Sequence, residues 1–300
     1  MRLGFIGVGN MGGPMAGHVV AAGHDVAVHD LNVELVEPLV EAGARRADSV
    51  SSAAEGAEAV LLSLPRPEDV EQVVTGAGGL LSSLATGTAI LDLTTSSPTT
   101  SRSLAETAGE QGISFLDAPV SGGVYGARKG TLAVMVGGPE DVFETYRPVF
   151  DTFAANVVRC GDVGAGNVVK VVNNMLAFVN MMGVTEALLL GVRAGVDPGV
   201  LREVVQASSG ASFVWDSGTR AILRDRLAPS FTTTLAGKDI GLAVDLAHEL
   251  DVPVPMGEHT KGLITQYRDN GFAEEDLLAT VRALEEQADF VVRGASPDIT

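Results

Sequence analysis

Lys170 is the side chain best suited to proton transfer, and it lies within the apolar run 168–172. Asn174 follows four residues later, so a helix would place both side chains on one face. An ordinary lysine has a pKa of about 10.4, and desolvation or a second cation such as Lys238 lowers it toward neutrality. Two interpretations remain open from the helix alone: a functional amine in a cleft, or an apolar stem that carries its ammonium to water.

A second segment with chemical potential is Ser121-Gly122-Gly123, which follows the apolar run 113–120. That run predicts a strand. Because glycines lack a Cβ, the backbone N–H groups of the three residues can converge on an anion, and the Ser121 hydroxyl adds a donor. The alternative is a plain glycine-rich connection between elements.

The third segment, Gly7-Val8-Gly9-Asn10-Met11-Gly12, follows the apolar run 2–6 and precedes a helical stretch at 13–22. A second predicted strand ends at Asp30. A Gly-x-Gly-x-x-Gly sequence inside such a βαβ unit is typical of dinucleotide binding. Gly7 would make the tight turn, Gly9 would admit the pyrophosphate, and Gly12 would allow close packing of helix and strand.

Asp30 distinguishes between the two nicotinamide dinucleotides. A carboxylate at the end of the second strand accepts hydrogen bonds from ribose hydroxyls and repels a 2′-phosphate. The chain has no Lys or Arg between Arg2 and Arg45 that would pair with such a phosphate. The sequence therefore favours NAD over NADP, and a merely solvated acid is the alternative.

Together these segments resemble a known family. The Gly7–Gly12 sequence, Asp117-Ala-Pro-Val-Ser-Gly-Gly123 and Gly164-x-Gly-x-x-x-Lys170-x-x-Asn-Asn174 match motifs of the β-hydroxyacid dehydrogenases, in the family's order and spacing. A fourth segment, Lys238-Asp-Ile-Gly-Leu-Ala243, is similar to another family motif. Members include 3-hydroxyisobutyrate dehydrogenases and 2-hydroxy-3-oxopropionate reductases.

The resemblance implies roles for individual residues. Lys170 would be the catalytic acid and base, Asn174 would hold the substrate, and Ser121, Gly122 and Gly123 would bind its carboxylate. Cofactor-binding positions would be Gly7, Val8, Gly9, Asn10, Met11, Gly12, Asp30, Leu64, Pro65, Thr95 and Lys238. Leu64-Pro65 and Thr95 also follow predicted strands, where residues face the cofactor in sheets of this kind.

The elements that must position these residues divide the chain in two. Strands alternate with helices from 1 to about 162, which predicts a Rossmann-type doubly wound α/β domain that binds NAD. From 163 to 300 the pattern is helical, which predicts an all-α substrate and oligomerisation domain. A long helix at about 165–194 would open it, followed by helices at 199–207, 234–250, 256–269 and 274–292 and a frayed tail at 294–300.

Composition restricts the partners. A net charge of −18 argues against nucleic acid and anionic membranes. Uninterrupted apolar runs are short, and the chain enters a predicted strand directly after Met1, which predicts neither a membrane span nor a signal peptide. A single cysteine, Cys160, fits the reducing cytoplasm, and the five histidines show no metal-binding spacing, so no metal is expected. The 165–194 helix is apolar on more than one face, which predicts a homodimer or homotetramer.

The favoured function is NAD-dependent oxidation of a small 3-hydroxy carboxylic acid, 3-hydroxyisobutyrate or a close analogue, to its semialdehyde. Alternatives are a 2-hydroxy-3-oxopropionate reductase, another semialdehyde or sulfonate reductase of the family, and, more remotely, a non-catalytic oligomerisation module. An intact Lys170 counts against that module and against imine reductases, which replace the lysine. The roles of Tyr125, Phe213, Trp215 and Phe231 stay open, as pocket walls or core.

Overall fold

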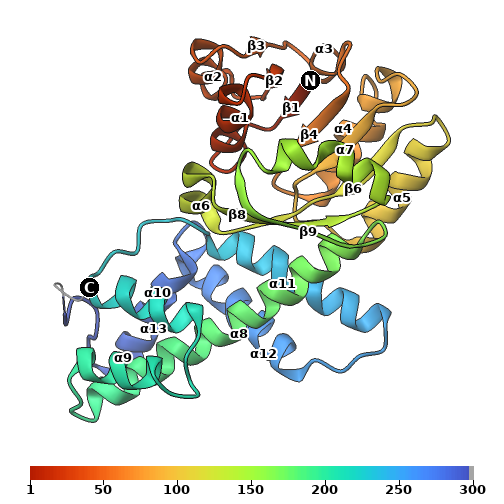
Figure 1. Ribbon diagram of the computed structural model, residues 1–300. Coiled ribbons are helices and arrows are strands. Elements are labelled where there is room, and N and C mark those ends of the chain that lie inside the picture. The colour runs from red at the N-terminus through yellow and green to blue at the C-terminus, as the bar shows by residue number, and fades with distance from the viewer. Residues whose placement is uncertain (297–300) are drawn as a thin grey trace. The chain divides into compact units, whose positions relative to one another are not determined.

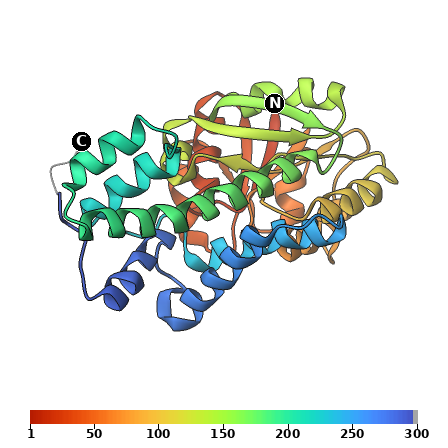
Figure 2. The same ribbon diagram turned by 90° about the horizontal axis from the view of Figure 1, so that it is seen from below.

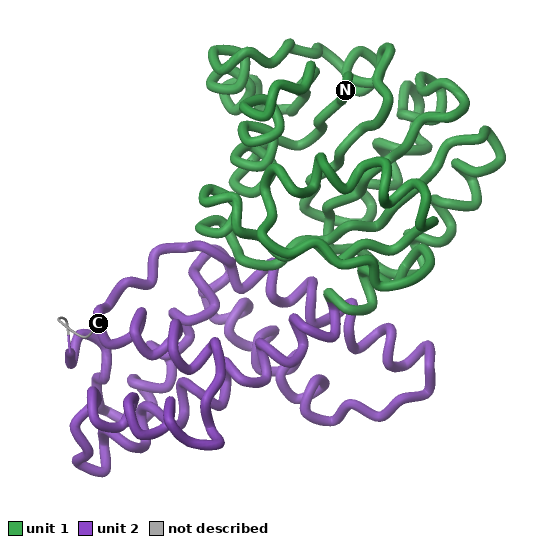
Figure 3. Tube along the Cα trace, viewed as in Figure 1, with its two compact units in different colours: residues 1–170 green, residues 171–300 purple. Residues whose placement is uncertain are grey.

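The computed structural model describes residues 1–296, so the last four positions of the expected tail lie outside the described residues. The chain forms two compact units, Met1–Lys170 and Val171–Thr300 (Figure 3). The first unit therefore ends inside a long helix, a little beyond the boundary at 162 that the sequence pattern suggests. Each unit is described by itself.

The first unit is built on a nine-stranded sheet with the strand order β3-β2-β1-β4-β5-β6-β8-β7, and β9 pairs with β8. The strands from β3 to β6 are parallel, while β8 runs antiparallel to β6 and β7 and parallel to β9. The strands are β1 (Arg2–Ile6), β2 (Asp25–His29), β3 (Arg45–Arg46), β4 (Ala59–Leu62), β5 (Ala89–Asp92), β6 (Ser114–Asp117), β7 (Val120–Ser121), β8 (Leu132–Gly137) and β9 (Ala154–Gly161).

Helices cover both faces of this sheet (Figure 1). Alternate residues of β4 enter different cores: Ala59 and Leu61 join one buried cluster, Val60 and Leu62 the other. A strand that is buried on both faces is typical of a parallel sheet between two helical layers. The helical segments are α1 (Gly12–Ala21), η1 (Val33–Leu35), α2 (Glu37–Glu41), α3 (Val50–Ala54), α4 (Pro67–Thr75), η2 (Leu80–Ser82), α5 (Pro98–Gly109), α6 (Gly123–Lys129) and α7 (Glu140–Phe150). The predicted Rossmann-type fold is confirmed.

The strand order reverses direction at β1 and β4, which are neighbours in the sheet. In doubly wound sheets, ligands bind beyond the carboxyl ends of the strands at this point. The Gly7–Gly12 loop follows β1 and Leu64 lies just beyond β4, so the sheet brings these two predicted segments to one edge.

The second unit is helical throughout its described part, as predicted. Its helical segments are α8 (Ala165–Arg193, which begins in the first unit), α9 (Pro198–Gln206), α10 (Phe213–Leu223), α11 (Thr233–Glu249), α12 (Pro255–Tyr267), η3 (Arg268–Phe272), η4 (Leu277–Thr280) and α13 (Val281–Ala288). The green α8 is one continuous helix in Figures 1 and 2. The Asp197 side chain accepts the N–H of Val200 and so caps α9, with Pro198 in its first turn.

Three sequence expectations differ from the structure. The single strand expected at 113–120 is divided into β6 and β7, separated by Ala118-Pro119, because proline has no N–H for a strand ladder. The last helix does not span 274–292: the Asp276 carboxylate accepts the N–H of Leu278 and starts η4, and α13 ends at Asp289 in a left-handed conformation. Helix α10 was not expected, although Ser212 caps it through the N–H of Trp215.

Helix α8 has the length and hydropathy of a membrane-spanning helix, although it contains no long uninterrupted apolar run. Over 29 residues it is long and apolar enough to cross a membrane by length and composition alone, with a mean hydropathy of 1.7 in its most apolar window. The expectation of no spanning segment rested on uninterrupted runs, which Lys170, Asn173 and Asn174 divide. A core helix of a soluble protein passes the same test, so this feature by itself is weak evidence for a membrane.

Candidate active site

The loop between β1 and α1 has the backbone geometry that a dinucleotide requires. Gly7 has a positive φ of 86°, and its N–H donates to the carbonyl of His29 across the sheet. A Cβ on Gly7 would collide with the Ser63 carbonyl, and one on Gly12 would collide with the Gly7 carbonyl. No atom lies within 4 Å of a Cβ built on Gly9. The outer glycines thus close the turn, and the middle one leaves its surface open to a pyrophosphate.

Asp30 is tied to this loop. Its Oδ2 accepts the N–H of Val8 at 2.8 Å and its Oδ1 accepts the N–H of Asn32 at 2.8 Å. Each carboxylate oxygen has a further lone pair, so the side chain can still accept ribose hydroxyls. The nearest cations along the chain are paired elsewhere: Arg45 with Asp25 at 2.8 Å and Arg46 with Glu37 at 2.7 Å.

The ends of β4 and β5 are connected to each other. The Leu64 N–H donates to the Thr94 hydroxyl at 3.0 Å, and the Thr94 N–H donates to Asp92 Oδ1 at 3.0 Å. Thr94 is buried, whereas Leu64 and Thr95 are half-buried and Pro65 is exposed. These contacts hold Leu64-Pro65 and Thr95, the residues expected to touch the cofactor, at the same edge as the glycine loop.

The Ser121-Gly122-Gly123 segment is held in a turn that only glycine adopts readily. Gly122 and Gly123 have φ values of 127° and 62°, and both are exposed next to half-buried Ser121. The glycine-rich stretch is not a plain loop after Gly123, since it forms α6 up to Lys129. Tyr125 on this helix is exposed. The segment is therefore accessible, as a substrate cradle requires.

The first turns of helix α8 bury three polar residues and expose two apolar ones. Asn167, Lys170 and Asn174 are only 0%, 8% and 6% exposed, and their spacing of three and four residues places them along one stripe. Val172 and Leu176 are 50% and 60% exposed. A half-exposed helix with a snorkelling lysine would show the opposite pattern, so the stem interpretation of Lys170 does not fit.

In the second unit, Asp239 holds two of the predicted site residues together. The Asn174 amide donates to Asp239 Oδ2 at 2.6 Å, and Lys238 Nζ lies 2.9 Å from Asp239 Oδ1. Asp239 is buried, and its charge offsets that of Lys238. Sequence reasoning quoted Asp239 only as part of a motif; the signal that it faces Asn174 is spread over 65 positions of the chain.

The large aromatic residues separate into different environments. Trp215 is buried, and its indole N–H donates to the Arg202 carbonyl at 3.1 Å, so it is a core residue. Phe213 is 84% exposed and belongs to no core. Phe231 is half-buried and stacks on Phe178 with 5.8 Å between ring centroids.

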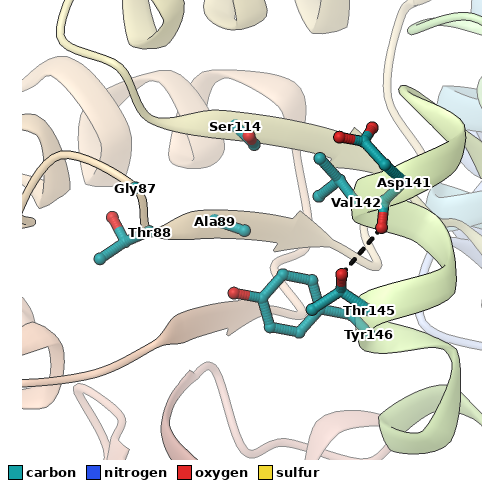
Figure 4. Close-up of a pocket in the computed structure, with 8 residues that line it drawn as sticks. All are labelled: Gly87, Thr88, Ala89, Ser114, Asp141, Val142, Thr145 and Tyr146. Atoms are coloured by element: carbon teal, nitrogen blue, oxygen red, sulfur yellow. Dashed lines mark hydrogen bonds between the residues drawn. The ribbon is translucent and has the colours of Figure 1, made fainter.

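The first unit also has a hollow of about 160 Å³ (Figure 4). Thr88, Ala89 and Ser114 line it at the amino ends of β5 and β6, and the Thr145 hydroxyl donates to the Asp141 carbonyl beside them. Ligands of doubly wound sheets bind at the opposite, carboxyl ends. This hollow is therefore not part of the candidate site.

Comparison with known proteins agrees with the geometry. Residues 2–161 match the model of the NAD-binding domain of 6-phosphogluconate dehydrogenase. Residues 164–284 match the model described as the NAD-binding region of NADP-dependent 3-hydroxyisobutyrate dehydrogenase. The chain is 42% identical to a 3-hydroxyisobutyrate dehydrogenase of Pseudomonas aeruginosa, over 92% of this chain and 95% of that protein.

The chain belongs to the β-hydroxyacid dehydrogenase family. A second relative, the NAD-dependent L-serine dehydrogenase of Pseudomonas aeruginosa, is 39% identical over 92% of this chain and 95% of its own length. The structure of Mycobacterium tuberculosis 3-hydroxyisobutyrate dehydrogenase with L-serine superimposes with a TM-score of 0.87 at 32% identity, covering 94% of this chain and 98% of that one.

Membership fixes the class of reaction. The protein is a dehydrogenase that acts on a CH–OH group, and its cofactor is NAD, as the glycine loop and Asp30 predict. The predicted family and enzyme class are confirmed. The specific substrate and the role of each site residue remain to be derived from the site itself.

Proposed function

We propose that the protein oxidises a 3-hydroxypropanoate bearing one small substituent at C2, with 3-hydroxyisobutyrate as the best candidate. The substrates named for its relatives, 3-hydroxyisobutyrate and L-serine, share the skeleton HOCH2–CH(R)–COO⁻ and differ only in R, a methyl or an ammonium group. The hydroxyl to be oxidised lies on the carbon β to the carboxylate in both. The observation that carries the proposal is the buried polar stripe of α8, with Lys170 in the middle.

Lys170 acts as the acid and base in this proposal. Its Nζ takes the proton of the substrate hydroxyl during oxidation and returns it during reduction. The cofactor, when bound, would supply the hydride acceptor for the same carbon as NAD+ and the hydride donor as NADH. A lysine serves as a base near neutral pH only when its ammonium form is destabilised, and burial among apolar neighbours does so.

The remaining polar groups orient the substrate. The N–H groups of Ser121, Gly122 and Gly123 and the Ser121 hydroxyl bind the carboxylate, and the Asn174 amide holds the hydroxyl end in register. Asp239 fixes the orientation of that amide, since it accepts one of its N–H groups. The short Ser-Gly-Gly segment, with only Arg128 and Lys129 as cations nearby, suits a carboxylate better than a phosphate.

A substrate panel tests the proposal. We expect kcat/KM with NAD to be highest for 3-hydroxyisobutyrate, lower for L-serine and D-glycerate, and negligible for lactate, whose hydroxyl is on the wrong carbon. A higher kcat/KM for 2-hydroxy-3-oxopropionate with NADH than for any hydroxy acid with NAD would instead favour the reductase alternative. Lactate as the best substrate would contradict the proposal.

We further propose that the exposed apolar face of α8 is covered by a second copy of the chain. Val169, Val172 and Leu176 are exposed at successive turns of this helix, and exposed apolar surface of this kind is typical of interfaces. Light scattering at micromolar concentration should give a dimer or tetramer mass, and Leu176→Glu should lower it. A wild-type monomer, or a protein that partitions into lipid vesicles, would contradict this assignment.

The two units divide the work in the same proposal. The first binds NAD through its sheet edge, and the second supplies Asn174 and Lys238 and the contact between copies. A cytoplasmic location completes the proposal, because the single cysteine, Cys160, cannot form a disulfide within the chain.

A further inference from the structure

Asp117, the last residue of β6, holds the beginning of α8. Its Oδ1 accepts the N–H of Gly164 at 2.7 Å and its Oδ2 accepts the N–H of Asn167 at 2.7 Å. The first N–H groups of a helix have no partner within the helix, so a carboxylate from another element can cap them. All atoms of this contact belong to the first unit, and Asp117 is completely buried.

Two glycines allow close packing around this carboxylate. A Cβ on Gly137 of β8 would collide with Asp117 Oδ1, and a Cβ on Gly166 of α8 would collide with the Met135 carbonyl. The two glycines therefore allow strand β8 and the first turn of α8 to meet at Asp117. A shift of the helix along or about its axis would break both hydrogen bonds at once.

We call the contact between Asp117 and the start of α8 the junction. Asn167 extends this junction to the segment that follows β5. Its side-chain oxygen accepts the N–H of Ser96 at 2.9 Å, and its Nδ2 donates to the Ser101 hydroxyl at 3.1 Å. Ser96 directly follows Thr95, which is expected to contact the cofactor. Through Asn167, the segment that carries Thr95 is bound to the helix that carries Lys170, three residues further on.

We propose that Asp117 and Asn167 are positioning residues that set the place of the Lys170 amine relative to the cofactor edge of the sheet. This inference rests on the proposed role of Lys170 as the acid and base. Capping a helix with a buried carboxylate costs free energy, because the ionised group loses its hydration on burial. Its two charge-assisted hydrogen bonds offset only part of that cost, but they fix the direction of the first helical N–H groups, which suits a helix that must not move.

The charge of Asp117 gives the junction a pH dependence. Burial raises the pKa of Asp117 to about 6, against the opposing effect of the two backbone hydrogen bonds. The charged and titratable groups that act on it are Arg102 of α5, which lowers its pKa, and Cys160 of β9, whose own pKa the carboxylate raises. Near pH 6 the group therefore loses the charge that lets both oxygens accept N–H groups.

The main test is Asp117→Asn. The amide keeps the size of the side chain but turns an NH2 group toward one of the two backbone donors. We expect kcat for 3-hydroxyisobutyrate to fall about 10- to 100-fold, because small misplacements of a catalytic group have effects of this size. NADH affinity, measured by fluorescence, should stay within about threefold of wild type, since the glycine loop and Asp30 are unchanged.

A matched control separates positioning from stability. Glu285 is also a buried carboxylate that accepts two backbone N–H groups, those of Val292 and Arg293, but in the second unit. Glu285→Gln should lower Tm at least as much as Asp117→Asn and leave kcat unchanged. Equal losses of kcat in both variants would reduce Asp117 to a structural residue and overturn the inference.

A double variant separates this inference from the proposed function. If Asp117 acts through Lys170, then Asp117→Asn should have no further effect on single-turnover rates in a Lys170→Ala background. Full activity of Lys170→Ala would refute the proposed function. A slow Lys170→Ala enzyme together with a fully active Asp117→Asn enzyme, or with independent and multiplying effects, would refute only the positioning role.

The pH dependence provides a signature that a structural residue lacks. In the reductive direction, with 2-methyl-3-oxopropanoate and NADH, protonated Lys170 is the active form, so its own titration gives no loss of rate toward acid pH. We expect the wild-type kcat to fall below about pH 6 and the Asp117→Asn rate to show no such step. The same step persisting in Asp117→Asn would contradict the inference.

The contribution of Asp117 to the free energy of unfolding should depend on pH in the opposite direction to kcat: it should be larger at acid pH. The folded-state pKa of about 6 lies above the reference value of 3.8, so the folded protein binds this proton more tightly than the unfolded chain. The contribution of Asp117 to stability is then greatest below pH 3.8 and is lost as the pH rises through 6. If Asp117→Asn does not fold, Asn167→Ala, which keeps the backbone donors, should still lower kcat about tenfold with little change in NADH affinity; unchanged kcat there would refute the junction.

Discussion

The predicted site residues fall into two halves, one in each unit, and the residues of each half are held in a different way. In the first unit, backbone groups dominate: Gly7, Gly9 and Gly12 shape a loop, and Asp30 is held by the N–H groups of Val8 and Asn32. In the second unit, side chains hold one another, with Asp239 between Asn174 and Lys238. In the proposed function, the first half binds a large cofactor through its main chain, and the second holds a few polar atoms in place for a small substrate.

This difference has a physical reason. A pyrophosphate is bound by N–H groups and a helix dipole that any sequence supplies, so only the shape of the backbone must be encoded, and glycine encodes it. A small hydroxy acid offers few atoms, so its site needs specific side chains held at fixed angles by buried partners. Substitutions should therefore act on binding of NAD in one half and on turnover in the other.

The largest expected effect is that of Lys170→Ala. Removal of the proposed acid and base should lower kcat about 10²- to 10⁴-fold, while NADH binding stays near wild type. Steady-state rates and fluorescence titration measure the two quantities. Lys261→Ala, which removes a lysine from an exposed ion pair with Asp245, is the control and should change neither. Turnover within about threefold of wild type would refute the mechanism.

The glycine loop offers a sharper test of the first half. Gly12→Ala places a Cβ against the Gly7 carbonyl and should lower both Tm and NADH affinity. Gly9→Ala meets no protein atom within 4 Å, so Tm should be unchanged while the Kd for NADH rises about 10- to 100-fold, the effect of a lost or displaced pyrophosphate contact. Gly109→Ala on α5, also without neighbours, should alter neither. Normal NADH binding by Gly9→Ala would place the pyrophosphate elsewhere.

The same contrast explains how much the sequence could predict. The glycine loop, Asp30 and the long helix could be predicted because each depends on neighbouring residues. The loop shows a glycine spacing, Asp30 ends a predicted strand, and the helix has a long apolar pattern. Asp117, Asn167 and Asp239 were not assigned roles, since each acts through partners between 47 and 71 positions away. The last helix was misplaced for a similar reason, because Asp276 also accepts the N–H of Ser230, 46 positions earlier, and so ends up outside the helix.

In the second half, Asp239→Asn removes the charge that orients Asn174 and Lys238. Hydrogen bonds to charged groups contribute about 1.5–3 kcal/mol, so kcat/KM for the hydroxy acid should fall about 10- to 100-fold. Asp245→Asn on the same helix removes only an exposed ion pair with Lys261. It should lower kcat/KM for the hydroxy acid less than about twofold. Equal effects of the two substitutions on kcat/KM would show that Asp239 does not orient Asn174 and Lys238 for the reaction.

The smallest effect should come from Asp30, where the first half uses a side chain rather than the backbone. With wild type, kcat/KM should favour NAD over NADP by at least about tenfold, since a carboxylate facing a 2′-phosphate costs about 1.4 kcal/mol or more. Asp30→Ser keeps a hydrogen-bonding group, removes the charge, and should reduce that preference to about threefold or less. Arg45 and Arg46 are paired with Asp25 and Glu37, so no released cation should reverse it. Equal wild-type rates with both cofactors would show that Asp30 does not face the ribose.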